Sequence, residues 1–507
     1  MTIEIGPPDA AASSEVPSPP AIHRAIRSRL LPGVAGGVLM LGFGLAGASR
    51  PELSWDEIAT ADVARRPVVQ IWHLLHHIDG VFGPYYLLMH LWTTVLGDSV
   101  LALRLPSILA MAAAVAAAGE LGRRAFGETV GIVAVVLLCL MPNTSRYAAE
   151  ARPYGFACLF ATLALLLLHR ALNDSRARRW CAYGAAVFCM GLSHLLVLAA
   201  LPAHAAICAL RLRRRPWRRP TLAWGASVAA ALLALSPLLW WGMHQRQEQL
   251  HWVKPLTLGA LCSFPARFVG TPETAWALIG LALYAASRLG RRSAETAVAA
   301  AVPLLVVGTV SAVGPSFWVI RYVLYVLMPT AVLAAAGLVH ACAGLRPRRV
   351  GARIVAALVV VAVAAAPGQL TVRGPTVKNG SDYRTLAGII RRRQAVGDVI
   401  VYQAGSRTLR PGVGYYLRTD AGAPRDVLMR QTAAQAAALI AQEYRDPVAR
   451  LAAANRIWLV VAARRGDPVN ARRDLARLLH AQYRRAGLWR VKRATMALYV
   501  HRRVNRR

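Results

Sequence analysis

Two acidic motifs lie beside apolar segments of this chain, and their carboxylates could support acid–base chemistry. The first is Ser54-Trp55-Asp56-Glu57, which follows the apolar segment 31–48, and the second contains Glu150, between two later apolar segments. Carboxylates at the ends of membrane helices are costly unless they serve a site. Asp56 and Glu57 are adjacent and cannot share one helix face, so one can point at a site while the other caps or orients. We expect Asp56, Glu57 and Glu150 to be catalytic residues of an enzyme at a bilayer surface. The alternative is a solvated loop pair or a helix N-cap.

Arginines accompany these carboxylates. Arg146 and Arg152 flank Glu150, and Arg321 opens an apolar segment after Phe317-Trp318. A guanidinium group can bind a phosphate through two hydrogen bonds, which makes all three arginines candidate phosphate ligands. Each could instead be a charge partner, a headgroup contact or an interfacial anchor.

Histidines form a third group near the first motif. His73 and His77 are one helical turn apart, a spacing that occurs in metal sites, although a His pair near a membrane interface is more often a polar contact. The cofactor is therefore unknown, with a divalent metal left open. His194 and His251 are further candidates for the same outer site.

The segments that must position these residues are apolar. The chain has 507 residues, of which 56% are hydrophobic and only 17% charged. Apolar runs recur from residue 31 to about residue 367, which predicts a polytopic α-helical membrane protein of about ten to twelve spans. The net charge of +36 comes almost entirely from arginines. Many of them lie in short loops, where the positive-inside rule explains them, so nucleic acid is not expected as a partner.

Changes in composition divide the chain into three parts. Residues 1–28 are expected to be a disordered cytoplasmic tail, residues 29–367 the transmembrane domain, and residues 368–507 an extracytoplasmic α/β domain. Within the last part, residues 383–393 favour a helix, and residues 398–403, 457–462 and 497–501 favour strands.

Two features of the crossing pattern need explanation. Residues 181–210 lie between basic loops and are expected to form two short spans that turn at Ser193-His194. Residues 81–96 and 105–121 are both apolar, yet two crossings there would place Arg123-Arg124 on the wrong side. Either one of these segments is re-entrant or lies in the interface, or this arginine pair is an exception to the rule.

The order of the motifs resembles that of the membrane glycosyltransferases of the GT-C superfamily. The motifs are Ser54-Trp55-Asp56-Glu57, His77-x-Asp79-x-x-x-Gly83-Pro84-Tyr85-Tyr86-x-x-x-His90-x-Trp92, Leu103-Arg104-Leu105-Pro106-Ser107, Glu150-Ala151-Arg152-Pro153-Tyr154 and Arg321-Tyr322. The nearest resemblance is to an actinobacterial, family-39-like branch related to protein O-mannosyltransferases and aminoarabinose lipid A transferases. It covers roughly residues 30–345. Many relatives have Pro-Pro where this chain has Gly83-Pro84.

The resemblance implies a polyprenyl-phosphate sugar donor, with mannose the expected sugar, and a lipid, glycan or protein acceptor outside the cytoplasm. It also implies a multi-pass protein of the plasma membrane with its active site on the outer face. The acidic residue of the first outer loop matches Asp56, and the second acidic position matches Glu150. The substrate-binding candidates are Asp79, Tyr85, Tyr86, His90, Arg146, Arg152, Tyr154, His194, Arg321 and Tyr322.

Two other classes remain open. A transporter or flippase of lipid-linked sugars would be expected to show internal repeats with broken helices at matching positions, and no convincing repeat is present. A non-catalytic lipid-binding scaffold would leave the acidic loop unexplained.

Overall fold

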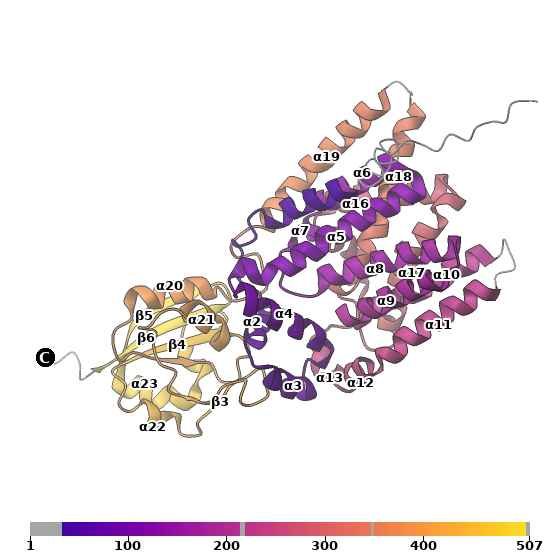
Figure 1. Cartoon of the computed structure of the whole chain (residues 1–507). Helices are drawn as coiled ribbons and strands as arrows, with labels where there is room; N and C mark the ends of the chain where they lie inside the picture. The colour runs from indigo at the N-terminus through magenta and orange to yellow at the C-terminus, as the bar shows by residue number, and fades with distance from the viewer. Residues whose placement is uncertain (1–32, 213–217, 346–348, 503–507) are drawn as a thin grey trace, which may run out of the picture.

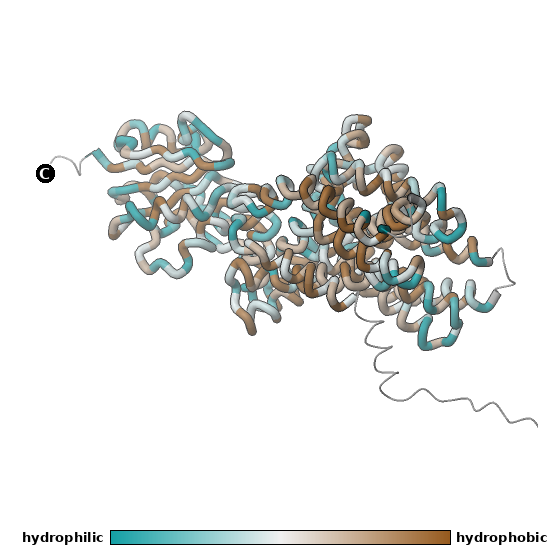
Figure 2. The backbone as a smooth tube through the Cα atoms, turned by 90° about the horizontal axis from the view of Figure 1, so that it is seen from above, coloured by the Kyte–Doolittle hydropathy of each residue, from teal (hydrophilic) through white to brown (hydrophobic). Residues whose placement is uncertain are grey.

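The computed structural model describes residues 33–212, 218–345 and 349–502, which form a helical bundle and a smaller domain with a sheet at one end of it (Figure 1). The predicted fold class, a helical membrane-type protein with a C-terminal α/β domain, is confirmed. Hydrophobic residues concentrate along the middle of the bundle, while the sheet domain and the opposite end of the bundle are mixed or hydrophilic (Figure 2). The expected tail, residues 1–28, lies outside the described residues.

Within the described residues, five helices are long and apolar enough to cross a membrane. They are α5 (Val100–Phe126), α8 (Tyr154–Asn173), α17 (Arg291–Val313), the segment Leu324–Gly344 that contains α18 (Leu327–Leu345), and α19 (Val350–Thr371). α19 extends beyond the boundary that the sequence suggested at residue 367.

Two bent pairs raise the possible number of spans to seven. α6 (Glu128–Leu140) meets α7 (Pro142–Ala148) at 71°, and α11 (Arg218–Ala234) meets α12 (Ser236–His244) at 58°. A proline lies in the first turn of each second helix, where its missing N–H costs nothing. The estimate of ten to twelve spans stays a prediction.

Shorter helices complete the bundle. These are the helix Gly33–Leu45, α9 (Ala177–Ser193), the 3-10 turn η2 (Leu195–Ala200), α10 (Leu201–Leu212), α13 (Arg246–Leu250), α14 (Leu258–Cys262), α15 (Phe264–Val269), α16 (Pro272–Arg288), η3 (Ile320–Tyr322) and η4 (Leu324–Val326). The expected break at Ser193-His194 is present between α9 and η2.

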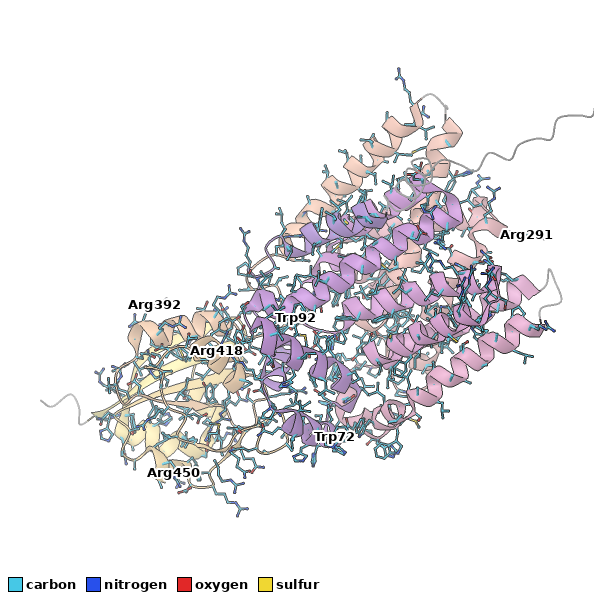
Figure 3. The ribbon with its side chains drawn as sticks, in the orientation of Figure 1. Trp72, Trp92, Arg291, Arg392, Arg418 and Arg450 are labelled. Carbon is cyan, nitrogen blue, oxygen red and sulfur yellow. The ribbon has the colours of Figure 1, made fainter. Side chains whose placement is uncertain are left out.

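Three short helices connect the bundle to the sheet domain: α2 (Trp55–Ala64), α3 (Val68–His77) and α4 (Gly83–Leu96), with the turn η1 (Gly80–Phe82) between the last two. Their 10 to 14 residues give about 15 to 21 Å of length, too little for a bilayer core of about 30 Å. α4 is too short for a full crossing at residues 81–96, which favours the alternative that this segment lies in the interface. Exposed apolar side chains on α3 and α4 suit that position, and Trp72 lies at the edge of the bundle (Figure 3).

The sheet has the order β1-β4-β6-β5 and confirms the three expected strands. Its members are β1 (Val399–Tyr402), β4 (Arg456–Ala462), β6 (Ala494–His501) and β5 (Tyr483–Val491). β1 and β4 are parallel and the other pairs antiparallel. A second small sheet joins β2 (Met429–Gln431) to β3 (Gln442–Glu443).

Helices cover both faces of the larger sheet. Alternate residues of a strand point to opposite faces, so Ile457 and Leu459 enter one core while Trp458 and Val460 enter the other. The first core includes residues of α22 (Pro447–Leu451) and α23 (Ala476–Gln482). The second includes the expected helix α20 (Tyr383–Arg393), α21 (Leu409–Leu417) and residues of α2, α3 and α4, so the sheet domain and the junction share one hydrophobic core.

Candidate active site

The site begins at the first turn of α2, where the sequence forms a helix cap. The Ser54 Oγ accepts a hydrogen bond from the Glu57 backbone N at 3.2 Å, and the Ser54 backbone N donates to Glu57 Oε2 at 2.9 Å. This reciprocal pair is a capping box, which fixes the start of the helix. It turns Glu57 inward and leaves Asp56 on the other side of the turn.

Glu57 is completely buried and accepts five hydrogen bonds. Besides Ser54, they come from Arg104 Nε at 2.7 Å and Nη2 at 2.9 Å, Lys378 Nζ at 3.0 Å and the Ala151 backbone N at 2.9 Å. Burial favours the protonated acid, but Arg104 and Lys378 outweigh it and hold the pKa of Glu57 well below its usual range. Glu57 is thus an ionised anchor with its acceptor positions occupied.

Asp56 differs from its neighbour because its side chain is 37% exposed and makes one long ion pair, with Oδ2 3.8 Å from Arg321 Nη2. Burial acts to raise the pKa of this carboxyl, but the positive charges of Arg152, Arg321 and Arg407 lower it below the ordinary value. Asp56 is therefore a carboxylate at neutral pH within a cluster of cations.

The arginines around Asp56 have unused hydrogen-bonding capacity. Arg152 is buried and lies over the ring of Phe82, 4.1 Å from its centroid, while Arg321 lies 4.8 Å from the ring centroid of Trp252. Within the described residues, the Nε groups of both lack a hydrogen-bond partner. Buried donors are normally satisfied, so this pair of free donors suits an anionic ligand.

Aromatic rings pack beside the arginines. The ring centroid of His194 lies 4.8 Å from that of Tyr322, 6.2 Å from that of Tyr154 and 6.1 Å from that of Phe82. Burial, together with Arg152 and Arg321, lowers the pKa of His194 to about 3. His194 is neutral, and its Nδ1 accepts a hydrogen bond from the Leu196 backbone N at 3.3 Å.

Asp79 joins the bundle to the sheet domain at the edge of this cluster. Its φ of +60° is left-handed, and its Oδ2 accepts hydrogen bonds from Tyr86 Oη at 2.7 Å and Arg407 Nη2 at 3.2 Å. The amide of Gln245 fixes the same turn by accepting from the Gly80 backbone N at 2.8 Å. Arg407 therefore acts on both Asp56 and Asp79.

Three other predicted residues have different surroundings. Glu150 is buried near the Glu57 cluster, and its Oε1 lies 3.4 Å from the Ser54 Oγ. Tyr85 is buried beside Phe156, with ring centroids 6.3 Å apart. His90 bonds the Ala64 backbone O at 2.9 Å and so ties α4 to α2.

Arg146 and the histidines of α3 complete the set. Arg146 lies over the ring of Tyr147 at 5.5 Å, with its Nε unpartnered among the described residues. His73 and His77 are exposed, and His77 Nδ1 bonds the His73 carbonyl at 2.9 Å. In the described parts of the chain, no group of three His, Cys, Asp or Glu residues could hold a metal ion.

Sequence reasoning did not assign three residues that the structure brings to the site: Arg104, Lys378 and Arg407. A signal existed for Arg104, because a charged residue in the first turns of an apolar helix is costly unless it is paired. Lys378 is one of only three lysines in the chain, but nothing in its neighbourhood predicts a partner. Nothing distinguishes Arg407 from the many other arginines of its domain.

One family model and a group of solved structures match this chain. Residues 84–241 match the family model "Dolichyl-phosphate-mannose-protein mannosyltransferase". The fold is similar to that of ArnT from Cupriavidus metallidurans in the apo state, with a TM-score of 0.60 and 14% identity over 94% of this chain and 98% of that one. The structure of the same protein bound to undecaprenyl phosphate gives a TM-score of 0.58, also at 14% identity, over 92% and 97%. No curated protein matches the sequence.

The chain therefore has the fold of the GT-C superfamily of membrane glycosyltransferases, and the resemblance drawn from its motifs is confirmed at that level. The structural likeness extends over the C-terminal domain, because it covers 94% of this chain.

Proposed function

We propose that this protein is an integral membrane glycosyltransferase that transfers a sugar, mannose, from a polyprenyl-phosphate donor to an acceptor outside the cytoplasm. Two comparisons support the donor class: the matching family is described as using dolichyl-phosphate-mannose, and the similar ArnT was solved with undecaprenyl phosphate. The family description supports mannose. The acceptor is a lipid, glycan or protein of the cell envelope, and the protein resides in the plasma membrane.

The observation that carries the proposal is the cationic cluster around Asp56. Arg152 and Arg321 are fixed by aromatic rings, and each has an Nε–H without a partner among the described residues. A phosphate with several acceptor oxygens satisfies such donors better than a neutral ligand does. We assign these arginines to the donor phosphate, with Arg407 and Arg146 as nearby cations.

The chemistry follows from this arrangement. An acceptor oxygen attacks the anomeric carbon of the sugar, the bond from that carbon to the phosphate oxygen breaks, and the acceptor proton passes to Asp56. The arginines stabilise the negative charge that develops on the departing polyprenyl phosphate. Asp56 is a weak base while three arginines face it, and the single negative charge of the donor phosphodiester would offset part of their charge and raise the pKa of Asp56. Donor binding would thus make Asp56 a better base.

The two other carboxylates have supporting roles in this proposal. Glu57 already accepts five hydrogen bonds, so we assign it to positioning the first turn of α2 and hence Asp56. Glu150, near Ser54, supports the same turn. Tyr154, His194 and Tyr322 form an aromatic wall for the donor. The side chains of this site do not suit a divalent cation. Arginines surround the carboxylate of Asp56, and the carboxylate of Glu57 already accepts five hydrogen bonds.

The test is a transfer assay with the purified protein, radiolabelled polyprenyl-phosphate mannose and envelope extract. Label in a new product that Asp56→Asn no longer forms supports the proposal. Intact labelled donor that crosses proteoliposome membranes would instead indicate a flippase. Donor binding with neither transfer nor crossing would indicate a scaffold, and transfer from a different sugar donor would correct the assignment of mannose.

A further inference from the structure

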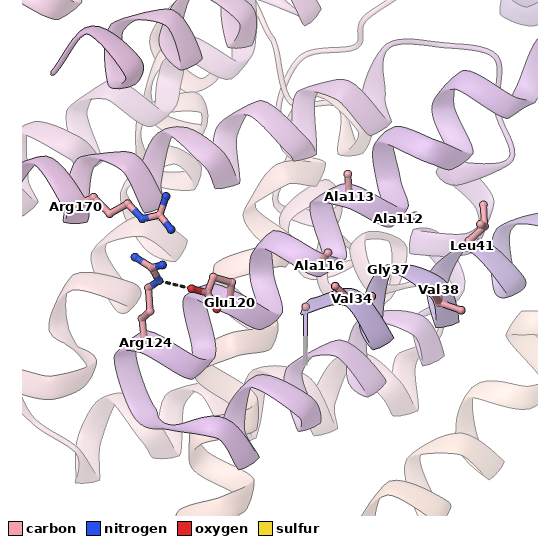
Figure 4. A pocket seen from close by; sticks show the side chains of 11 residues that line it. Val34, Gly37, Val38, Leu41, Ala112, Ala113, Ala116, Glu120, Arg124 and Arg170 are labelled. Atoms are coloured by element: carbon pink, nitrogen blue, oxygen red, sulfur yellow. Dashed lines mark hydrogen bonds and ion pairs between the residues drawn. The ribbon is translucent and has the colours of Figure 1, made fainter. Parts of the chain in front are cut away.

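A surface groove lies at the end of the bundle opposite the candidate active site. Its volume is about 470 Å³, and its walls are the helix Gly33–Leu45, the second half of α5 and the end of α8. Its lining residues are Gly33, Val34, Gly37, Val38, Leu41, Ala112, Ala113, Ala116, Glu120, Arg124 and Arg170 (Figure 4).

The groove is apolar for most of its length because small residues let two helices approach. A Cβ atom on Gly37 would lie 3.5 Å from the Ala116 Cβ, so the helix backbones are close there. Val34 and Val38 border the groove with 62% and 65% of their surface exposed. Such walls suit a flexible hydrocarbon chain better than a polar ligand.

One end of the groove is cationic. Glu120 forms ion pairs with Arg123 at 2.7 Å and with Arg124 at 2.5 Å, so one carboxylate faces two guanidinium groups. The guanidinium group of Arg170 approaches that of Arg124 across the groove (Figure 4), and the described residues include no ion pair for it. Among the residues that line the groove, Arg124 and Arg170 against Glu120 leave one positive charge in excess, which favours an anionic occupant.

The groove is separate from the site at Asp56. Arg104, which binds Glu57, and Arg124 lie on the same helix, α5, and twenty residues at about 1.5 Å each place them about 30 Å apart. That distance matches the hydrocarbon core of a bilayer. The two sites are therefore at opposite leaflets when α5 spans the membrane.

We propose that this groove is a binding site for an anionic glycerophospholipid of the leaflet opposite the active site. The lipid phosphate lies between Arg124 and Arg170, and an acyl chain follows Ala113 and Val38. The basic residues that precede Gly33 in the sequence, Arg24, Arg27 and Arg29, are poor occupants because the groove end already has excess positive charge.

The experiment is native mass spectrometry of the purified full-length protein in detergent, titrated with dioleoyl phosphatidylglycerol and, separately, with dioleoyl phosphatidylcholine. We expect one retained phosphatidylglycerol that the double variant Arg124→Gln/Arg170→Gln binds at least tenfold more weakly. Ala113→Phe fills the groove without changing charge and should give the same loss. Phosphatidylcholine should bind weakly to every form.

The control is Arg291→Gln/Arg292→Gln, which removes two exposed arginines of α17 that do not line the groove; Arg291 lies at the same far end of the bundle (Figure 3). Equal loss in this control would reduce the effect to general surface charge and overturn the proposal. Unchanged binding in both groove variants would also overturn it and assign the groove to another occupant, such as the N-terminal segment. If the protein retained added undecaprenyl phosphate but no phosphatidylglycerol, the groove would be a second position for the polyprenyl carrier instead.

Discussion

Asp56 and Glu57 are neighbours with the same chemistry, and the structure predicts opposite consequences for their neutralisation. Glu57→Gln removes the only carboxylate that ion-pairs with Arg104 and Lys378 among the described residues, and all three side chains are at most 2% exposed. The amide nitrogen also places a donor where the carboxylate accepted hydrogen bonds. Asp56→Asn changes a 37% exposed side chain whose one ion pair is 3.8 Å long.

The expected costs differ several-fold. Breaking a buried ion pair from one side costs about 3–5 kcal/mol, because the remaining charge stays buried without compensation. An exposed pair contributes about 0–1 kcal/mol, and the long, partly exposed pair between Asp56 and Arg321 is closer to this case than to a buried one. Conversely, loss of a general base lowers the rate by about 10²–10⁴-fold. Asp56→Asn should therefore be stable and inactive, while Glu57→Gln should be unstable.

The assay combines two measurements on each purified variant: thermal unfolding followed by tryptophan fluorescence, and transfer of labelled sugar well below the unfolding temperature. We expect Glu57→Gln to unfold several degrees below the wild type and Asp56→Asn to unfold close to it. Glu248→Gln, at an exposed position of α13, controls for the amide substitution. Equal unfolding temperatures for the two site variants would falsify the assignment of Glu57 as a buried anchor.

Three further expectations concern the donor site, the topology and the packing of the bundle. Arg152→Ala should weaken donor binding at least tenfold, and Arg152→Lys should recover it only in part because a lysine lacks the planar fork; unchanged donor affinity in a binding titration would remove this arginine from the site. Asp420→Cys should react with an impermeant thiol reagent on wall-stripped intact cells, whereas labelling only after lysis would place the C-terminal domain in the cytoplasm. Gly337→Ala should lower the unfolding temperature because its Cβ would collide with the backbone O of Leu281, while Gly280→Ala, with open space at its Cβ, should not; equal effects would contradict the close packing of α16 and α18.

Local patterns were sufficient to predict the elements of the sheet domain. The helix at residues 383–393 and the three strands match α20, β1, β4 and β6 because alternating burial and helical periodicity are properties of short segments. Hydropathy could not distinguish α4 from a span. Its 14 residues are apolar enough for either position, and only its packing against α2 and α3 places it at the junction.

The sequence was enough to propose the acidic residues of the candidate site, which stay predictions, but not to supply their contacts. The sequence indicated that one of the two adjacent acids faces the site while the other caps or orients. The capping box, in which Ser54 is the N-cap residue and Glu57 is its partner, assigns the second role to Glu57. What the sequence could not supply was the partner set. Lys378 is 321 positions from Glu57, and no local pattern encodes a contact of that separation.

The contacts made by Lys378 and Arg407 give the C-terminal domain a part in the electrostatics of the candidate site. A domain that only covered the bundle would meet it through surface side chains, whereas here Lys378 supplies a buried counter-charge to Glu57 and Arg407 contributes to the charge on Asp56. A shared hydrophobic core joins the sheet to α2, α3 and α4 and holds the domain against these helices. A small displacement of the domain would therefore both uncover a buried ion pair and remove a cation from the carboxylate. It follows that the α/β domain helps to set the charge state of the candidate active site, even though its own segment contains no acidic pair or histidine cluster comparable to those of the bundle.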